Sequence, residues 1–322
     1  ILPASFWLIW RFSRLLKHQD LNIDYFRQND IHFFLNKEPM SFADSFAQTH
    51  GPAICSMGWR VKNAKHAFEK AVERGARPAN KRDYPELPAI YGIGDSLIYF
   101  VEDYKNPKRY EDMGFVTHPH VQKVADKGFT AIDHLTNNVH KGTMNIWAQF
   151  YKNIFHFEEV RYFDIRGAKT GLTSYALRSP CGKFCIPINE GSEAKSQINE
   201  YLEEYHGPGI QHLAFLTEDI LSSLEKLKGT GIETLDIDDQ YYQEIFHKFP
   251  QVTENHQKIK DFSVLVDGDE KGYLLQIFTK NIIGPIFIEI IQRKNHYSFG
   301  EGNFGALFRS IERDQMKRGV LS

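Results

Sequence analysis

One eight-residue pattern occurs twice in the chain, and this repeat limits the folds that the sequence can adopt. The segment 50–57, HGPAICSM, lines up with the segment 206–213, HGPGIQHL. Each copy is followed by a helical pattern that ends in glycine and then by a strand-like stretch, the helices at 63–75 and 218–231 and the stretches at 97–101 and 273–278. Self-similarity of this kind indicates a duplicated supersecondary unit. We therefore predict two halves, each with a strand, a helix and several further strands, that meet near 119–127.

Three polar side chains stand alone in apolar, strand-like runs. Glu289 lies within the run 286–291, and His134 and His212 lie in runs of the same kind. Such runs are typical of buried strands, where an unpaired ionised carboxylate would cost several kcal/mol. A divalent metal bound by two imidazoles and one carboxylate would offset that cost, and this ligand set is typical of non-haem Fe(II) oxygenases. The alternative is that each histidine is a hydrogen-bonded core residue and that Glu289 pairs with Arg293.

The repeat favours the metal interpretation over the packing interpretation. In the alignment of its two copies, Ser56 takes the place of His212. The first copy has therefore lost a ligand that the second copy keeps, and a residue that only filled a core would not require this difference. Because long stretches of chain separate His134, His212 and Glu289, no local helix motif can hold all three. We predict that they converge on one metal position from different strands.

Composition places further limits on function. The 322 residues are enough for one large or two medium domains, and 42% hydrophobic and 25% charged residues are ordinary for a globular protein. A net charge of −2 gives no reason to expect nucleic acid as a partner. The aromatic content of 14% would suit a pocket for an aromatic ligand, although a β-rich core would use most of these rings. The three cysteines, Cys55, Cys181 and Cys185, favour a reducing cytoplasm over a disulfide framework and do not have the spacing of a zinc site.

The first residues show an unusual order of apolar and basic side chains. Residues 1–10 are mostly apolar, and Arg11, Arg14 and Lys17 follow them, which is the reverse of the order in a signal peptide. The apolar part is too short to span a bilayer, so we expect no stable membrane association, with a helix on the membrane surface as the alternative. Since there is no initiator Met, we expect a fragment or an atypical translation start.

Five sequence blocks, in order, indicate a resemblance to a known family. They are 131–139 (AIDHLTNNV), 209–215 (GIQHLAF), 274–279 (LLQIFT), 289–293 (EIIQR) and 299–304 (FGEGNF). From about residue 19 to the end, the chain resembles the 4-hydroxyphenylpyruvate dioxygenases of the vicinal-oxygen-chelate superfamily. The resemblance implies an α+β fold of two β-barrel-like domains built from paired βαβββ modules, as in glyoxalases and extradiol dioxygenases. The domains would be a non-catalytic one at 19–125 and a catalytic one at 126–322, whose last helix, 303–318, would act as a lid.

The resemblance also implies roles for individual residues. His134, His212 and Glu289 would bind Fe(II), and Phe299 and Phe304 match the two phenyl rings that hold the substrate ring. The remaining residues that resemble the family's substrate pocket are Ser174, Asn189, Gln197, Gln211, Gln276, Phe278 and Asn303. Of these, Asn189, Gln211 and Gln276 would take part in catalysis. Surface or turn hydrogen bonding is the alternative role for each polar residue.

The implied activity is the conversion of 4-hydroxyphenylpyruvate and O2 to homogentisate and CO2, a step in tyrosine and phenylalanine catabolism. The substrate is an aromatic 2-oxo acid that chelates the metal itself, so no separate 2-oxoglutarate is needed. Family members form dimers or tetramers, and we therefore expect a homo-oligomer.

Three alternative functions remain. Hydroxymandelate synthase uses the same substrate and metal but oxidises the benzylic carbon, and Ser174, Pro187, Asn189 and Phe304 fit the dioxygenase pattern better. An extradiol ring-cleaving dioxygenase would not explain the block 299–304. A non-catalytic cytolysin or pigment-associated protein on the same fold is favoured only by the apolar N-terminus.

Residues 1–18 depart from the family's start, which should supply the first strand of the first module. We therefore predict that this segment packs poorly against the first domain. Deleting it should leave turnover nearly unchanged.

Overall fold

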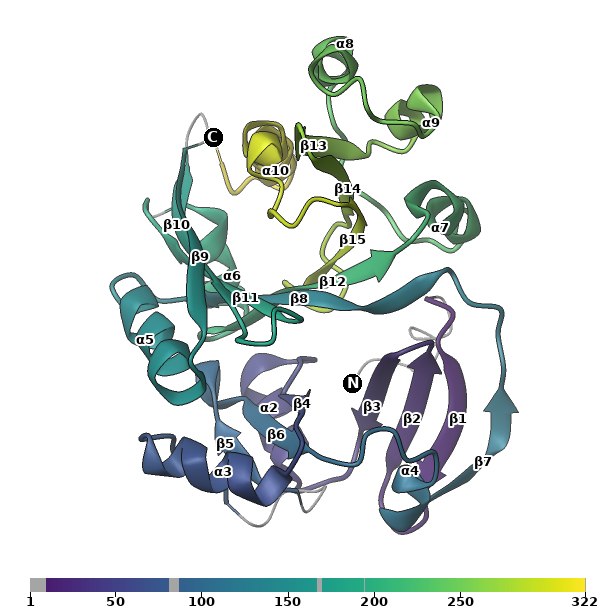
Figure 1. Ribbon diagram of the computed structural model, residues 1–322, viewed down its shortest axis with the longest axis vertical. Coiled ribbons are helices and arrows are strands. Elements are labelled where there is room, and N and C mark those ends of the chain that lie inside the picture. The colour runs from purple at the N-terminus through teal and green to yellow at the C-terminus, as the bar shows by residue number, and fades with distance from the viewer. Residues whose placement is uncertain (1–9, 81–86, 167–169, 194, 322) are drawn as a thin grey trace.

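The computed structural model describes residues 10–80, 87–166, 170–193 and 195–321 (Figure 1). Within these residues the named strands form three sheets, of eight, four and three strands. The eight-stranded sheet is formed by the C-terminal half of the chain, and the two smaller sheets by the N-terminal half. Helices pack against all three, which confirms the predicted α+β class.

The eight-stranded sheet consists of two copies of one module, in the strand order β13-β14-β15-β12-β8-β11-β10-β9. In each copy the first strand pairs in parallel with the fourth, β8 with β11 and β12 with β15, and the other pairs within the copy are antiparallel. A helix follows each first strand, α5 (Met144–Phe155) after β8 and α7 (Ile220–Leu227) after β12. The eight strands are β8 (Phe129–Val139), β9 (Glu158–Arg166), β10 (Gly171–Arg178), β11 (Cys185–Gly191), β12 (Gly209–Thr217), β13 (Leu265–Asp269), β14 (Gly272–Phe278) and β15 (Phe287–Lys294). This arrangement is the predicted pair of βαβββ modules.

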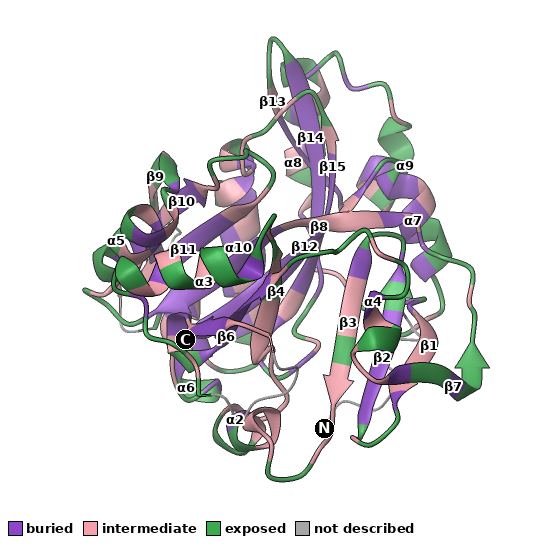
Figure 2. Ribbon diagram, turned by 60° about the horizontal axis from the view of Figure 1, so that its bottom comes forward, coloured by how far each residue is buried: buried purple, intermediate pink, exposed green. Residues whose placement is uncertain are grey.

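Strand β14 of this sheet is apolar along most of its length because both of its faces are covered. Every residue of β14 is buried, and Figure 2 shows β14 and β15 as buried ribbons. The helix predicted at 303–318 is α10 (Phe304–Lys317), preceded by η2 (Glu301–Asn303), and it lies between the two arms of the sheet (Figure 1). The other helices of this half are α6 (Gln197–Glu204), α8 (Asp239–Lys248) and α9 (His256–Asp261).

The N-terminal half contains sheets of the order β3-β2-β1-β7 and β4-β6-β5. Its elements are β1 (Ser13–His18), β2 (Ile23–Gln28), β3 (Ile31–Asn36), α2 (Phe42–His50), β4 (Ser56–Arg60), α3 (Ala64–Glu73), β5 (Ala89–Tyr91), η1 (Ile93–Asp95), β6 (Leu97–Val101), α4 (Arg109–Asp112) and β7 (Phe115–Gln122). Strands β4 and β6 pair in parallel with α3 between them in sequence, as β12 and β15 do with α7. The first register pair is Ser56 with Leu97 in one half and His212 with Phe287 in the other. The backbone thus supports the equivalence of Ser56 and His212.

The prediction that residues 1–18 pack poorly is wrong for residues 10–18, while residues 1–9 lie outside the described part of the chain. Strand β1 pairs with both β2 and β7, so it is an inner strand of its sheet. Trp10 and Phe12 are fully buried, and both rings contact Phe215 of the C-terminal half, at centroid distances of 5.7 and 5.8 Å. The apolar start of the chain therefore belongs to a core that the two halves share.

Replacing Trp10 by Ala should destabilise the protein strongly. The change empties a site between Phe129 and Phe215, and truncation of a buried aromatic ring typically costs about 3–5 kcal/mol. Chemical denaturation followed by circular dichroism would measure this loss. Met40→Ala, at a side chain that is 93% exposed, is the control and should change the free energy of unfolding by less than about 0.5 kcal/mol. Equal stability of the two variants would contradict the placement of Trp10.

Candidate metal centre

Strand register brings His134, His212 and Glu289 onto one face of the large sheet. His134 lies on β8, His212 on β12 and Glu289 on β15, which are three adjacent strands. Ala214 of β12 is the register partner of His134 on one side and of Glu289 on the other. His212 lies two residues before Ala214, and side chains two apart on a strand point to the same face. The three side chains are therefore neighbours although the sequence separates them widely.

The three side chains meet at a single point in the interior. Nε2 of His134 is 3.1 Å and Nε2 of His212 is 3.4 Å from the same carboxylate oxygen, Oε2 of Glu289. One ligand atom from each residue lies within 4.8 Å of the others, and all three residues are buried. Ligands bonded at right angles to a first-row metal, with bonds of about 2.1 Å, would lie about 3 Å apart. The three side chains are therefore close enough to bind one metal ion, as the predicted binding of a metal at this point requires.

Hydrogen bonds behind the histidines turn both rings toward this point. Nδ1 of His134 donates to Oδ1 of Asp133 at 2.7 Å, and Nδ1 of His212 donates to Oε1 of Gln211 at 3.1 Å. Each bond leaves Nε2 facing Glu289, and such outer partners commonly fix the tautomer and orientation of metal-binding histidines. Arg293 pairs with Asp133 through two hydrogen bonds, at 2.7 and 2.8 Å. The alternative in which Arg293 is the partner of Glu289 is therefore wrong.

The electrostatics of the site favour one positive charge, on a protonated His134. Burial lowers the pKa of His134, but the carboxylates of Glu289 and Asp133 outweigh this effect and raise it to about 9. Burial raises the pKa of Glu289, but the two imidazoles outweigh it and hold that pKa at about 2. The pKa of His212 is lowered, chiefly because the ring is buried. A divalent cation would replace the proton on His134, so metal binding should release a proton and weaken as the pH falls.

The donor set suits a divalent first-row metal. Two imidazole nitrogens and one carboxylate oxygen on one face would bind such an ion and leave three adjacent positions for other ligands. Two aromatic rings border the histidines. Phe287 stacks on His212 with 4.7 Å between centroids, and Phe299 meets His134 edge-on at 5.5 Å. The sequence did not single out Phe287, although its place two residues before Glu289 puts it on the ligand face.

A row of polar residues crosses the same face farther along the strands. Ser174 of β10 is the register partner of Asn189 of β11, and Asn189 is the partner of Asn138 of β8. Nδ2 of Asn189 donates to Oδ1 of Asn138 at 3.3 Å. Asn138 lies four residues beyond His134, which is about 13 Å at about 3.3 Å per residue. The predicted pocket residues Ser174 and Asn189 therefore share the concave face with the metal ligands, whereas Asn138 was not predicted.

Gln276 is the most unusual polar residue of this face. It lies on β14 two residues before Phe278, which is the register partner of Glu289. Gln276 is fully buried, and neither its amide nitrogen nor its amide oxygen has a protein partner. Nδ2 of the buried Asn303 is unpaired as well, although its oxygen accepts a bond from Tyr241 at 2.7 Å. Buried polar groups without partners are rare, and here they point to a polar ligand or to ordered water.

Gly300 gives Gln276 the room that it needs. Gly300 has a φ of 77°, and a Cβ built there would lie 2.1 Å from Nε2 of Gln276. Gly300→Ala should therefore displace the amide and lower kcat/KM for the substrate by at least about 10-fold, in addition to about 1–2 kcal/mol of backbone strain. The control is Gly319→Ala, which has the same φ of 77° but open space around its Cβ. Steady-state kinetics of the two variants separate the effect on Gln276 from the backbone strain, and equal activities would contradict this role of Gly300.

Phe304 and Gln197 lie at the edges of the predicted pocket. Phe304, the first residue of α10, meets Phe163 edge-on at 5.2 Å, and Phe163 is the register partner of Ser174. Gln197 begins α6 and lines a small cavity of about 60 Å³ together with Gln211 and Phe278. No contact between Phe299 and Phe304 occurs among the described residues, so the pairing of these rings around a substrate stays a prediction.

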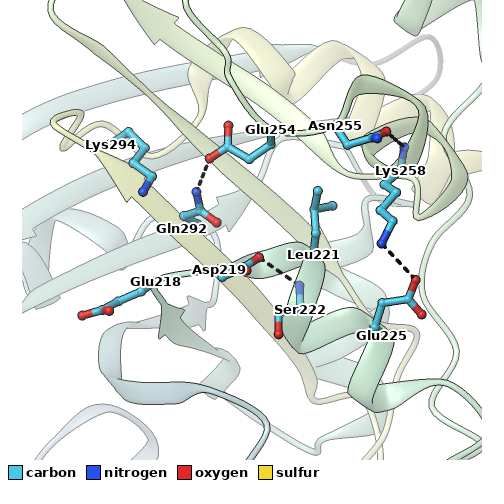
Figure 3. Close-up of a pocket in the computed structure, with 10 residues that line it drawn as sticks. All are labelled: Glu218, Asp219, Leu221, Ser222, Glu225, Glu254, Asn255, Lys258, Gln292 and Lys294. Atoms are coloured by element: carbon cyan, nitrogen blue, oxygen red, sulfur yellow. Dashed lines mark hydrogen bonds and ion pairs between the residues drawn. The ribbon is translucent and has the colours of Figure 1, made fainter.

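A larger hollow, of about 670 Å³, lies beside α7 and α9 (Figure 3). None of the candidate metal ligands lines it. Four of its polar side chains pair with one another, since Gln292 donates to Glu254 and Lys258 lies 3.6 Å from Glu225. The metal centre is therefore the better candidate for chemistry.

Known proteins share the sequence around this site. The family described as "Hydroxyphenylpyruvate dioxygenase, HPPD, N-terminal" matches residues 5–116, and the "Glyoxalase/Bleomycin resistance protein/Dioxygenase superfamily" matches residues 131–276. A 4-hydroxyphenylpyruvate dioxygenase of Legionella pneumophila is 46% identical over 96% of this chain and 89% of that protein. The chain belongs to the 4-hydroxyphenylpyruvate dioxygenase family. The predicted family and the predicted class of enzyme, a dioxygenase, are thereby confirmed.

Further relatives carry other names. Protein MelA of Shewanella colwelliana is 60% identical over 96% of this chain and 90% of that protein. Hemolysin VllY of Vibrio vulnificus is 45% identical over 97% of this chain and 89% of that protein. A mutant 4-hydroxymandelate synthase from Streptomyces coelicolor has a similar structure, with a TM-score of 0.81 and 25% identity over 97% of this chain and 94% of that one. The dioxygenases of this superfamily depend on a metal, and the chain belongs to one of their families.

Proposed function

We propose that the chain converts 4-hydroxyphenylpyruvate and O2 to homogentisate and CO2, with Fe(II) bound by His134, His212 and Glu289. The convergence of these three buried side chains is the observation that supports the proposal most. Relatives named 4-hydroxyphenylpyruvate dioxygenase, at 46% and 44% identity over nearly the whole chain, support the same substrate.

The residues around the metal would bind and orient the substrate. Bound Fe(II) would supply the activation of O2 and the one-electron chemistry of the reaction. Two neutral imidazoles and one carboxylate leave a single positive charge on the ion, which favours a chelating monoanion such as a 2-oxo acid. The rings of Phe278, Phe287 and Phe299 would exclude water from this position. The free amide of Gln276 would hydrogen-bond the substrate.

The row of Ser174, Asn189 and Asn138 would bind the end of the substrate that lies away from the metal. Asn189 and Ser174 face the same side of the sheet as the metal ligands, and Phe304 lies against Phe163 above that row. A substrate whose oxo acid lies at the metal and whose ring extends toward this row would contact both groups of residues. Gln211, through its bond to His212, would act on the metal ligand, and Gln197 would contribute to the outer wall of the pocket.

The structural similarity to a 4-hydroxymandelate synthase makes benzylic oxidation the second candidate reaction. Both reactions start from the same substrate and release CO2, so consumption of O2 does not distinguish them. The test is product analysis of the purified protein with Fe(II), O2 and 4-hydroxyphenylpyruvate, by chromatography against both standards. We expect homogentisate, with Fe(II)-free protein as the blank. 4-Hydroxymandelate as the main product would refute the proposed function, and so would the absence of any turnover.

We also propose a cellular compartment and an oligomeric state for the enzyme. No helix in the described residues is both long and apolar enough to cross a membrane. All three cysteines are free, which supports a reducing cytoplasm as the compartment. We propose a homo-oligomer that acts in tyrosine and phenylalanine catabolism, with a non-catalytic N-terminal domain that includes strand β1 and ends near 125, and a catalytic domain at 126–322. Size-exclusion chromatography with light scattering would test the oligomeric state.

A further inference from the structure

Arg293 joins two parts of the site that lie in different segments of the chain. It lies on β15, four residues after Glu289, and its side chain is only 12% exposed. Nε and Nη2 donate to the two carboxylate oxygens of Asp133, at 2.8 and 2.7 Å. Nη1 donates to the backbone carbonyls of His296 and Ser298, at 3.1 and 2.6 Å. One guanidinium therefore contacts both strand β8 and the segment 295–300 that follows β15.

On the β8 side, the contact continues to a metal ligand. Oδ1 of Asp133 accepts from Nη2 of Arg293 and from Nδ1 of His134, both at 2.7 Å. Because the planar guanidinium holds both oxygens of the carboxylate, it fixes the direction from which Asp133 meets the imidazole. The orientation of His134 thus depends on Arg293 through one intervening side chain.

On the other side, the contact fixes a segment that has no strand or helix of its own. Residues 295–300 lack regular secondary structure, and Ser298 immediately precedes Phe299. The ring of Phe299 meets the ring of His134 edge-on, with 5.5 Å between centroids and 78° between planes. Gly300, the next residue, lies against the amide of Gln276. The carbonyl of Ser298 is therefore held next to two residues that face the candidate substrate position.

We propose that Arg293 is a positioning residue for the reaction proposed above, which fixes the metal ligand His134 and the Phe299 segment relative to each other. This inference rests on the proposed function for its effect on the product, but its effects on metal binding and on the segment do not depend on that function. Lysine cannot replace arginine in this role, because one ammonium group cannot reach both oxygens of Asp133 and the carbonyl of Ser298 in the same geometry.

The test compares Arg293→Lys with the wild type in three measurements. Titration of the metal-free protein with Co(II), followed by absorbance, should show a dissociation constant about 10-fold higher, since loss of an outer partner typically costs about 10- to 100-fold in metal affinity. Hydrogen–deuterium exchange of peptides covering 296–300 should be faster. With Fe(II) and 4-hydroxyphenylpyruvate, the ratio of homogentisate to CO2 should fall. Arg60→Lys is the matched control, because Arg60 holds both oxygens of Asp30 at 2.6 and 2.7 Å far from the site, and it should change none of the three.

Asp133→Asn provides a second variant, which keeps Arg293 and the size of the side chain but removes the carboxylate between the two partners. It should raise the Co(II) dissociation constant as well, so the proposal stays testable if Arg293→Lys does not fold. An unchanged Co(II) constant in either folded variant would overturn the proposal. Weaker Co(II) binding by Arg293→Lys without faster exchange at 296–300 would also overturn it, since the coupling would be absent. If both effects occur but the wild type forms no homogentisate, the proposed function fails and the positioning role stands.

Discussion

Glu289→Gln should abolish tight metal binding and lower kcat/KM by at least about 100-fold. The carboxylate is the only charged donor of the three, and Oε2 is the atom that both histidines approach, at 3.1 and 3.4 Å. An amide oxygen carries no charge, so it neither neutralises a divalent cation nor holds the two imidazoles toward one point. Loss of a direct ligand should exceed the roughly 10- to 100-fold effect typical of outer partners. Metal content after reconstitution with Fe(II), together with O2 consumption, would measure both effects.

The fold of Glu289→Gln should survive, because Gln has the same shape as Glu and Asp133 remains as a carboxylate partner of His134. Glu254→Gln is the matched control. Glu254 is partly buried and accepts hydrogen bonds from Tyr273 and Gln292, but it lies outside the metal centre. The control should keep its metal and its activity. Full metal content in Glu289→Gln, with the ligands folded as described, would show that the triad does not bind the metal.

The identity of the metal ligands could be predicted from the sequence because the residues next to each ligand in sequence indicate a buried strand. A single carboxylate in an apolar strand needs compensation, which holds for Glu289, and His134 and His212 lie in strand-like runs of the same kind. The alignment of the two repeat copies added a further indication, because Ser56 takes the place of His212 in the first copy. The helix at 303–318 could be predicted for a similar reason, since the period of its apolar residues depends on the helix alone.

Contacts across strands could not be predicted, because they depend on register. Nothing local indicates that Ala214 pairs with both His134 and Glu289. The same is true of Asp133 and Arg293, which form their hydrogen bonds across a long separation in sequence. The earlier pairing of Arg293 with Glu289 failed because it used closeness in sequence, whereas residues four apart on a strand share a face without touching.

The packing of the N-terminal segment could not be predicted from the sequence either. Trp10 and Phe12 lie at the end of a mostly apolar stretch, whose order before basic residues resembled an unpacked extension. Their partners, Phe129 and Phe215, belong to the other half of the chain. A core that two halves share is visible only when both halves are folded, so a pattern within residues 1–18 could not indicate it.

Phe304→Ile should change the product of the reaction without removing the metal. Phe304 is half-buried at the start of α10, where its ring meets Phe163 above the row of Ser174 and Asn189. We propose that it packs on one face of the substrate ring while Phe299, beside His134, packs on the other. Isoleucine removes one stacking surface, which is worth about 0.5–1.5 kcal/mol, or roughly a 2- to 10-fold change in rate. The ring would then be free to turn, so that its CH2 group rather than its C1 carbon faces the metal.

Decarboxylation should therefore continue in Phe304→Ile while part of the product changes from homogentisate to 4-hydroxymandelate. Chromatography of the products, with CO2 release and iron content measured on the same sample, would separate these effects. Phe34→Ile, at a ring that is 44% exposed in the N-terminal half, is the control and should form homogentisate alone. Since Phe304 contacts none of the three ligands in the described residues, the iron content of the variant should equal that of the wild type. Loss of iron from Phe304→Ile, or homogentisate as its sole product at the wild-type rate, would show that Phe304 does not hold the substrate ring.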